Sequence, residues 1–79
     1  MARVLLFGRL SDVAGWRERQ VDSASIATLR ALLSGEDANL GEALAGPGVQ
    51  VALDQAIVRG DAALNAQSEV AFLPPMSGG

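Results

Sequence analysis

The pattern of hydrophobic and polar positions predicts five short β-strands. Four of them are apolar or alternate between apolar and polar residues, and the second, at residues 18–21, is predicted as the strand that returns after a turn. The five strands cover residues 3–8, 18–21, 49–53, 56–58 and 69–73. Side chains alternate between the two faces of a strand. Arg3, Leu5 and Phe7 are therefore expected to share one face of the first strand, which we expect to point outward.

A helix is predicted between the second and third strands. Ser25 offers a hydroxyl to the first free amides of a helix, and a stripe of apolar side chains at helical spacing follows it. The stripe consists of Ile26, Leu29, Leu32 and Leu33. Gly35 is predicted to end this helix. A weaker pattern at residues 39–45, followed by Gly-Pro-Gly at 46–48, predicts a second, shorter helix.

The connections complete the predicted topology. Residues 11–17 contain an aspartate and Gly15, and they are predicted to form the turn of a hairpin between the first two strands. Residues 60–67 are polar and alanine-rich, and they are expected to cross the domain with one helical turn around Leu64. The last strand is expected beside the first in the middle of the sheet, and the third strand at a sheet edge.

The order strand, strand, helix, strand, strand, strand is that of the β-grasp fold. We therefore expect an α+β domain over residues 1–73, with a mixed sheet of about five strands and one main helix on one face. Residues 74–79 are expected to form an extended, flexible C-terminal tail that ends in Gly-Gly.

Composition excludes most stand-alone catalysis. A length of 79 residues suffices for one small domain, whose thin core cannot enclose a deep substrate cavity. The chain has no cysteine and no histidine. It therefore lacks a thiol nucleophile, an imidazole base and the usual side-chain ligands of zinc. We expect no metal site and no cofactor bound by this chain.

Charge and hydropathy favour protein partners. All six basic residues are arginines and the net charge is −3, which is unfavourable for nucleic-acid binding. No apolar run approaches the roughly 20 residues of a membrane-spanning helix, and the first residues lack the cleavage site of a signal peptide. We expect neither nucleic acid nor membrane as a partner, and a cytoplasmic location.

The C-terminal tail carries the candidate chemistry. Pro74 and Pro75 cannot donate to a sheet ladder, so strand pairing must stop there, and six extended residues reach about 20 Å. Such an arm suits a narrow tunnel. The Gly79 carboxylate is a poor electrophile, but a partner that holds ATP could convert it to an acyl-adenylate. The alternative is an ordinary frayed terminus.

The order of elements together with VAFLPPMSGG resembles the small subunit of molybdopterin synthase, a ubiquitin-like sulfur carrier. The resemblance covers nearly the whole chain. Its supporting segments are RVLLFG, the Gly15 loop, ATLRALL, VALDQAIV, and above all Pro74, Pro75, Ser77, Gly78 and Gly79. Two turns depart from the family pattern: Gln67-Ser68 replaces the usual Gly-Asp, and Asp54 stands where Asn is common.

The resemblance implies a cycle of activation and sulfur transfer at Gly79. An adenylating enzyme similar to ubiquitin-activating enzymes would use ATP and Mg to form the Gly79 acyl-adenylate. A persulfide-bearing sulfurtransferase would then supply the sulfur of a Gly79 thiocarboxylate. The tail would thread into the active site of the large subunit of molybdopterin synthase. The threading residues would be Pro74, Pro75, Met76, Ser77 and Gly78.

In that active site the sulfur would be donated to cyclic pyranopterin monophosphate, and two rounds would build the dithiolene of molybdopterin. The resemblance thus implies a non-catalytic, sulfur-donating subunit in a heterotetramer of two small and two large subunits. Two alternatives remain open. The chain could be a thiocarboxylate carrier of thiamine thiazole synthesis. It could instead be a ubiquitin-like protein modifier or a plain interaction module.

A carrier also needs a docking surface. Alternation in the last strand places Leu73 opposite Phe72, and we expect Leu73 to face outward and Phe72 to lie in the core. With Ile57 and Phe7, Leu73 would form an apolar partner-binding patch at the root of the tail. The alternative is that Phe7 and Ile57 are ordinary core residues. Trp16 is expected to cover one end of the core.

Overall fold

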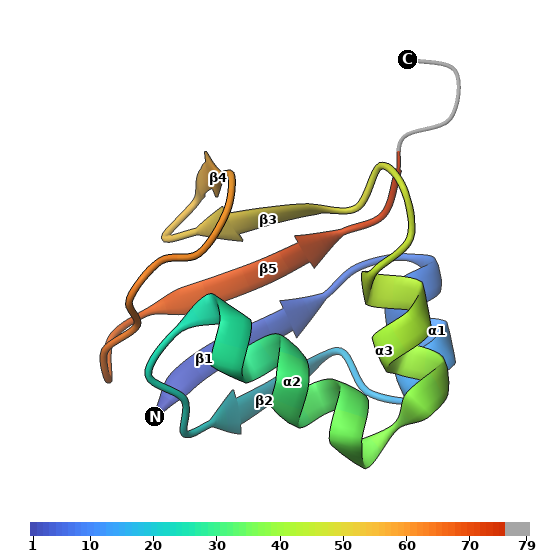
Figure 1. The fold of residues 1–79 in the computed structure, drawn as a ribbon, viewed down its shortest axis with the longest axis horizontal. Helices are drawn as coiled ribbons and strands as arrows, with labels where there is room; N and C mark the ends of the chain where they lie inside the picture. Colours follow the sequence, from blue (N-terminus) through green and yellow to red (C-terminus); the bar gives the residue numbers. More distant parts are fainter. Residues whose placement is uncertain (76–79) are drawn as a thin grey trace.

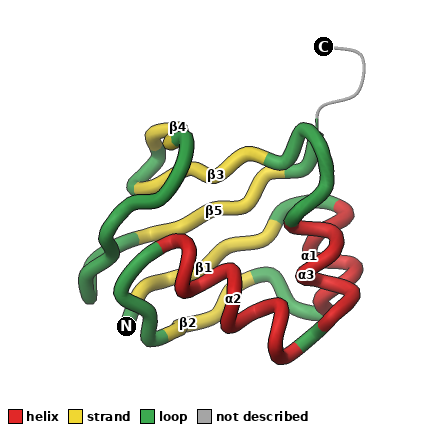
Figure 2. Tube along the Cα trace, viewed as in Figure 1, coloured by secondary structure: helices red, strands yellow, loops and turns green. Residues whose placement is uncertain are grey.

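The computed structural model describes residues 1–75, in which five strands and three helices follow one another (Figures 1 and 2). The elements are β1 (Ala2–Leu6), α1 (Arg9–Ala14), β2 (Glu18–Val21), α2 (Ile26–Glu36), α3 (Ala38–Leu44), β3 (Gln50–Leu53), β4 (Ala56–Val58) and β5 (Glu69–Leu73). All five predicted strands are present. The first is shifted toward the N-terminus and ends at Leu6, and the third begins at Gln50.

The strands form one mixed sheet in the order β2-β1-β5-β3-β4. β1 and β5 run parallel, and the other neighbours are antiparallel. The central place of β5 beside β1 is as predicted. Because β1 and β3 hold β5 on both sides, the segment that follows β5 leaves from the middle of the sheet.

β3 does not lie at the sheet edge, as the sequence pattern had indicated, because β4 folds back along its outer side. Asp54 and Gln55 form the connecting turn with positive φ angles of 50° and 71°, the backbone of a tight two-residue hairpin. The turn is also tied to β5. Asp54 donates its backbone N–H to the Glu69 carbonyl at 2.8 Å and accepts the Glu69 N–H on Oδ1 at 2.9 Å. Asp54 therefore fits this turn at the position where asparagine is common in the family that the sequence resembles.

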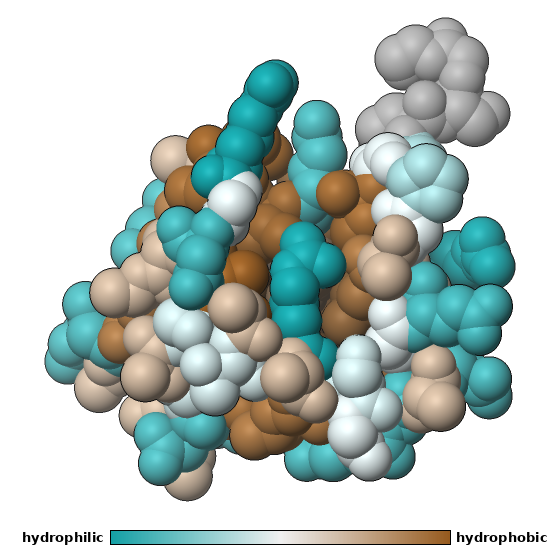
Figure 3. All heavy atoms as spheres, in the orientation of Figure 1, coloured by the Kyte–Doolittle hydropathy of each residue, from teal (hydrophilic) through white to brown (hydrophobic). Residues whose placement is uncertain are grey.

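The core lies between one face of the sheet and α2, which crosses that face (Figure 1). Ser25 caps α2 as predicted, accepting the Thr28 N–H at 3.1 Å. Three residues of the predicted helical stripe are buried, and Leu32 packs at its margin. The largest fully buried side chains include Phe72, Ile26, Leu29, Leu33 and Leu40. Hydrophobic atoms remain visible between the helices and the β3–β4 side (Figure 3), where Val49, Leu53 and Val58 are only partly buried.

A short helix, α1, stands where a simple hairpin turn was predicted. Gly8 and Gly15 bracket it with φ angles of 56° and 82°, conformations that glycine adopts without steric cost. α1 packs against α3, and Leu10 is buried in the core. Trp16 follows and packs against the core margin, with the Arg19 guanidinium 5.0 Å from its ring centre.

Two further predictions about helices are corrected. α2 continues past Gly35 and ends at Glu36, because Asp37 donates its N–H to the Leu33 carbonyl at 3.0 Å. Residues 60–67 contain no helical turn. Their backbone pairs instead with the start of α2: Ile26 donates to the Ala62 carbonyl at 3.0 Å, and Leu64 donates to the Ala24 carbonyl at 2.8 Å. The predicted second helix is present as α3. Within residues 1–75, none of the helices has the length and hydropathy to cross a membrane.

Candidate functional site

The candidate site begins where β5 ends. Strand pairing continues to the last residue of β5. On one side Leu73 pairs with Gln50 of β3. On the other side the Phe7 N–H donates to the Phe72 carbonyl at 3.3 Å. Pro74 and Pro75 follow directly and offer no N–H to extend either ladder. The segment that leaves the domain therefore starts from a backbone that is fixed on both sides.

Two glycine loops approach these prolines. Gly8, between β1 and α1, lies so close to Pro74 that a β-carbon on it would stand 3.2 Å from the proline Cγ. Gly48, before β3, lies closer still, since a β-carbon there would stand 2.7 Å from the Cβ of Pro75. We call this arrangement of Gly8, Gly48, Pro74 and Pro75 the tail collar. The sequence analysis missed it, having taken Gly48 only as part of a helix stop.

Met76, Ser77, Gly78 and Gly79 lie outside the described residues. The threading of Pro74 to Gly78 and the reaction at Gly79 therefore stay predictions. The structure does establish where the tail begins, in the centre of the sheet and between two loops.

The sheet face opposite α2 carries an apolar area next to the tail root. Ala52 pairs with Ala71 on one side and with Ile57 on the other, and Leu5 also pairs with Ala71. Leu73 lies two residues after Ala71, and Phe7 lies two residues after Leu5, so their side chains point to the same face. We call this set the outer-face patch. It consists of Leu5, Phe7, Ala52, Ile57, Ala71 and Leu73.

Phe7 and Ile57 are 44% and 50% exposed. The alternative that these two side chains belong to the core is therefore wrong. Leu73 is half-buried on the outer face, while Phe72 is fully buried on the other. Partner binding through Phe7, Ile57 and Leu73 stays a prediction, but the structure brings all three to the same face of the sheet.

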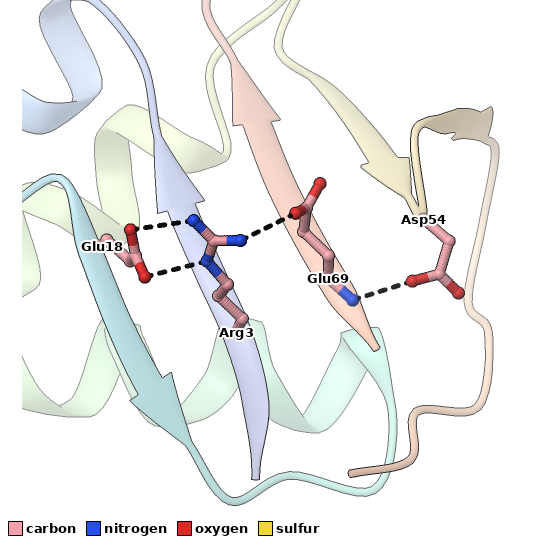
Figure 4. Close-up of polar contacts among 4 residues, drawn as sticks. All are labelled: Arg3, Glu18, Asp54 and Glu69. Atoms are coloured by element: carbon pink, nitrogen blue, oxygen red, sulfur yellow. Dashed lines mark hydrogen bonds and ion pairs between the residues drawn. The ribbon is translucent and has the colours of Figure 1, made fainter. Parts of the chain in front are cut away.

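The opposite end of the outer face is charged (Figure 4). The Arg3 guanidinium contacts both carboxylate oxygens of Glu18, at 2.8 and 3.1 Å, and reaches Glu69 at 3.4 Å. The hydrogen bond from Arg3 holds the pKa of the Glu18 carboxyl below its ordinary value. The face thus has an ionic end beside the N-terminus and an apolar end beside the tail.

Within residues 1–75, no group of three or more histidine, cysteine, aspartate or glutamate side chains is arranged to hold a metal ion. Among the hollows described on this part of the surface, one is lined by a group with a shifted pKa, Glu18. The two shifted groups, Arg3 and Glu18, pair with each other. What this arrangement can do chemically is present a chain end, beside an apolar face, to another protein.

A five-stranded mixed sheet in the order β2-β1-β5-β3-β4, crossed by a helix on one face, defines a ubiquitin-like β-grasp protein. The sequence model of the ThiS family matches residues 4–79. The chain therefore belongs to the ThiS family of ubiquitin-like sulfur carriers.

Solved structures agree with this fold. SAMP1 from Haloferax volcanii is 28% identical, with a TM-score of 0.84 over 99% of this chain and 98% of that chain. The small archaeal modifier protein 1 from Methanosarcina acetivorans is 20% identical, with a TM-score of 0.86 over 99% and 95%. A molybdopterin converting factor subunit 1 from Pyrococcus furiosus is 23% identical, with a TM-score of 0.81 over 95% and 97%. The last two show the fold alone. A search of curated proteins found no match.

Proposed function

We propose that this chain is the sulfur-carrier subunit of a molybdopterin synthase. The observation that carries the proposal is the tail root. The central strand runs directly into Pro74-Pro75 beside an exposed apolar patch, and the sequence continues with Met-Ser-Gly-Gly. A domain that holds its chain end in this way suits delivery of that end into a partner's active site. The resemblance of the PPMSGG segment to the small synthase subunit supports the pathway.

The proposed chemistry starts at the Gly79 carboxylate. One of its oxygens attacks the α-phosphorus of ATP on an adenylating enzyme, and pyrophosphate leaves as Gly79 becomes an acyl-adenylate. The ATP and Mg belong to that enzyme. The outer sulfur of a sulfurtransferase persulfide then attacks the acyl carbon and AMP leaves, which gives an acyl disulfide between Gly79 and the sulfurtransferase cysteine. A thiol attacks the cysteine sulfur of this bond, so that a new disulfide forms and the Gly79 thiocarboxylate is released. Because the chain has no cysteine, the sulfur is carried on the terminal carbonyl carbon.

The loaded carrier then docks on the large synthase subunit, and its tail enters the active site there. The thiocarboxylate sulfur is donated to cyclic pyranopterin monophosphate, and a second loaded carrier supplies the second sulfur of the dithiolene. In this scheme the catalytic groups belong to the large subunit, within a heterotetramer of two small and two large subunits. The proposed cycle takes place in the cytoplasm.

A second candidate is a ubiquitin-like modifier, whose Gly79 forms an amide with a lysine of a target protein. The 28% identity to SAMP1 of Haloferax volcanii over 99% of this chain favours it. Both candidates share the acyl-adenylate and differ in the nucleophile that follows. A thiocarboxylate carrier of thiamine thiazole synthesis is also compatible with the family assignment, and the experiments below distinguish it.

Intact-mass analysis of the native protein tests these functions. Exchange of one oxygen for sulfur at Gly79 supports a carrier, and an adduct on foreign lysines supports a modifier. The pathway is then tested by reconstitution. The thiocarboxylate form, mixed with purified large subunit and cyclic pyranopterin monophosphate, should yield the dithiolene. A chain without Gly79 should keep its fold and lose this activity, whereas Gln20→Ala, on the far strand β2, should keep both. Dithiolene synthesis by the truncated chain would refute the mechanism.

A further inference from the structure

The tail collar rests on two backbone conformations that leave room for proline. Gly8 and Gly48 have φ angles of 56° and 83°, in the left-handed region that favours glycine. Each is the point of its loop nearest to one proline. The 2.7 Å that would separate a Gly48 methyl group from Pro75 Cβ is far below the roughly 3.5 to 4.0 Å at which carbon atoms pack. No other residue type fits at Gly48 unless the proline moves.

Both loops are themselves anchored. The Gly8 carbonyl accepts three hydrogen bonds from the start of α1. They come from the Ser11 N–H at 3.1 Å, the Ser11 hydroxyl at 2.8 Å and the Asp12 N–H at 3.3 Å. The loop before β3 is braced by the Gly46 N–H, which donates to the Ala43 carbonyl of α3 at 3.2 Å. The collar therefore connects the prolines to α1 on one side and to α3 on the other.

We propose that Gly8 and Gly48 are positioning residues that set the direction in which the last four residues leave the domain. This inference rests on the proposed function of the tail. Pro74 and Pro75 have restricted φ angles and no N–H, so backbone hydrogen bonds cannot orient them as they orient β5. Contact with the two glycine loops orients Pro74 and Pro75 instead.

The consequence for the reaction is geometric. A partner that binds the outer-face patch fixes the sheet, and the collar then fixes where the tail starts and how it is aimed. A displacement at Pro75 changes the point and direction from which the tail leaves the domain. Misplacement of a reacting group by about 1 Å can cost about 100-fold in rate. Distortion of the collar should therefore impair reactions at Gly79 without loss of the domain.

The chain offers a matched control glycine for the test. Gly60 has a φ angle of 84°, and a β-carbon there would have no neighbour within 4 Å. Gly60→Ala therefore places alanine at the same positive φ angle as Gly48→Ala without touching a proline. Gly8 has no such control, because its ψ angle is −130° whereas that of Gly15 is 12°.

The first measurement is adenylation of Gly79 by its activating enzyme with ATP and Mg. Gly48→Ala and Gly60→Ala should lower the thermal midpoint alike, but only Gly48→Ala should lower kcat/KM, by about tenfold or more. Equal kinetics for Gly48→Ala and Gly60→Ala would overturn the inference.

A second measurement does not depend on any enzyme. Because the chain has no cysteine, Gly79→Cys provides a single site for a nitroxide spin label. Paramagnetic broadening of the amide signals of Arg9 and Val49, which follow the two collar glycines, then reports the direction of the tail. The ratio of the two broadenings should shift in Gly48→Ala and stay at the wild-type value in Gly60→Ala. A wild-type ratio in Gly48→Ala overturns the inference. Failure of the wild-type chain to be adenylated would overturn the proposed function and leave this readout intact.

Discussion

Gln50 and Leu73 are paired across β3 and β5, one residue before Pro74. The pair marks the last point at which the sheet holds the chain. It also lies where the outer-face patch meets the tail, because the Leu73 side chain belongs to the patch while its carbonyl carbon is bonded to Pro74. In the proposed function, a partner that contacts Leu73 would also be placed next to the start of the tail. Leu73 would then couple recognition of the domain to delivery of the tail.

The first prediction concerns that coupling. Leu73→Arg should weaken binding to the large synthase subunit by about tenfold or more, equivalent to about 1.4 kcal/mol, because it replaces an apolar contact with a charge. The thermal midpoint should change little, since Leu73 is only half-buried. Isothermal titration calorimetry with the purified subunit measures the first effect and thermal melting the second.

Gln20→Arg is the control for this experiment, because Gln20 is exposed on β2 and lies outside the outer-face patch. It adds the same charge and should leave binding unchanged. Wild-type affinity in Leu73→Arg would show that the outer-face patch is not the docking surface. Loss of the folding transition would show that Leu73 serves the core.

Much of the fold follows from local patterns in the sequence. β2, β4 and β5 begin and end at the predicted residues, and the Ser25 hydroxyl marks the start of α2. The outward facing of Leu73 follows from strand alternation once Phe72 is placed in the core. These features depend on residues within a few positions of one another, which is why a single sequence carries them.

The features that were missed depend on contacts between distant segments. α1 has six residues and one buried side chain, Leu10, so its pattern was too short to distinguish from a turn. Its signal was the spacing of Leu10, Val13 and Ala14 between two glycines. The approach of Gly48 to Pro75 joins residues far apart in the chain. Nothing local to Gly-Pro-Gly distinguishes a helix stop from a collar.

The second prediction compares two phenylalanines. Phe72 is fully buried, with the Arg30 guanidinium 5.5 Å from its ring centre, whereas Phe7 is 44% exposed. Phe72→Ala should lower the free energy of unfolding by about 3 to 5 kcal/mol, because it opens a cavity in a small core. Phe7→Ala should cost far less, about 0.5 kcal/mol, and should weaken partner binding instead. Urea denaturation measures both, and equal losses of stability would contradict the assignment of faces.

The third prediction concerns acid. The hydrogen bond from Arg3 lowers the pKa of Glu18 in the folded state below its ordinary value of 4.5. A lowered folded pKa means that the pair stabilises the fold above pH 4.5, and that this contribution is lost as the pH falls through the folded pKa. Glu18→Gln should therefore be less stable than wild type at neutral pH, and the difference should shrink below pH 4.5.

Thermal melting between pH 7 and pH 3 measures this difference, and high salt should reduce it because both side chains are exposed. Glu42→Gln provides the comparison, since Glu42 is exposed and has no ion pair among residues 1–75. A difference between wild type and Glu18→Gln that does not vary with pH would exclude the ion pair as its source.

The fourth prediction concerns Asp37, which joins two helices. Its N–H closes α2 on the Leu33 carbonyl, and its Oδ1 accepts the Asn39 and Leu40 N–H groups of α3 at 3.0 and 3.1 Å. Asp37→Ala removes only the two hydrogen bonds to Oδ1 and should lower the free energy of unfolding by about 1 kcal/mol. Asp37→Asn keeps an acceptor and should retain most of the stability. Urea denaturation gives the cost, and hydrogen exchange of the Asn39 and Leu40 amides locates it. Because α3 braces the Gly48 loop, faster exchange should extend to Gly46 in Asp37→Ala. Equal destabilisation by alanine and asparagine would show that the carboxylate does not act as a cap.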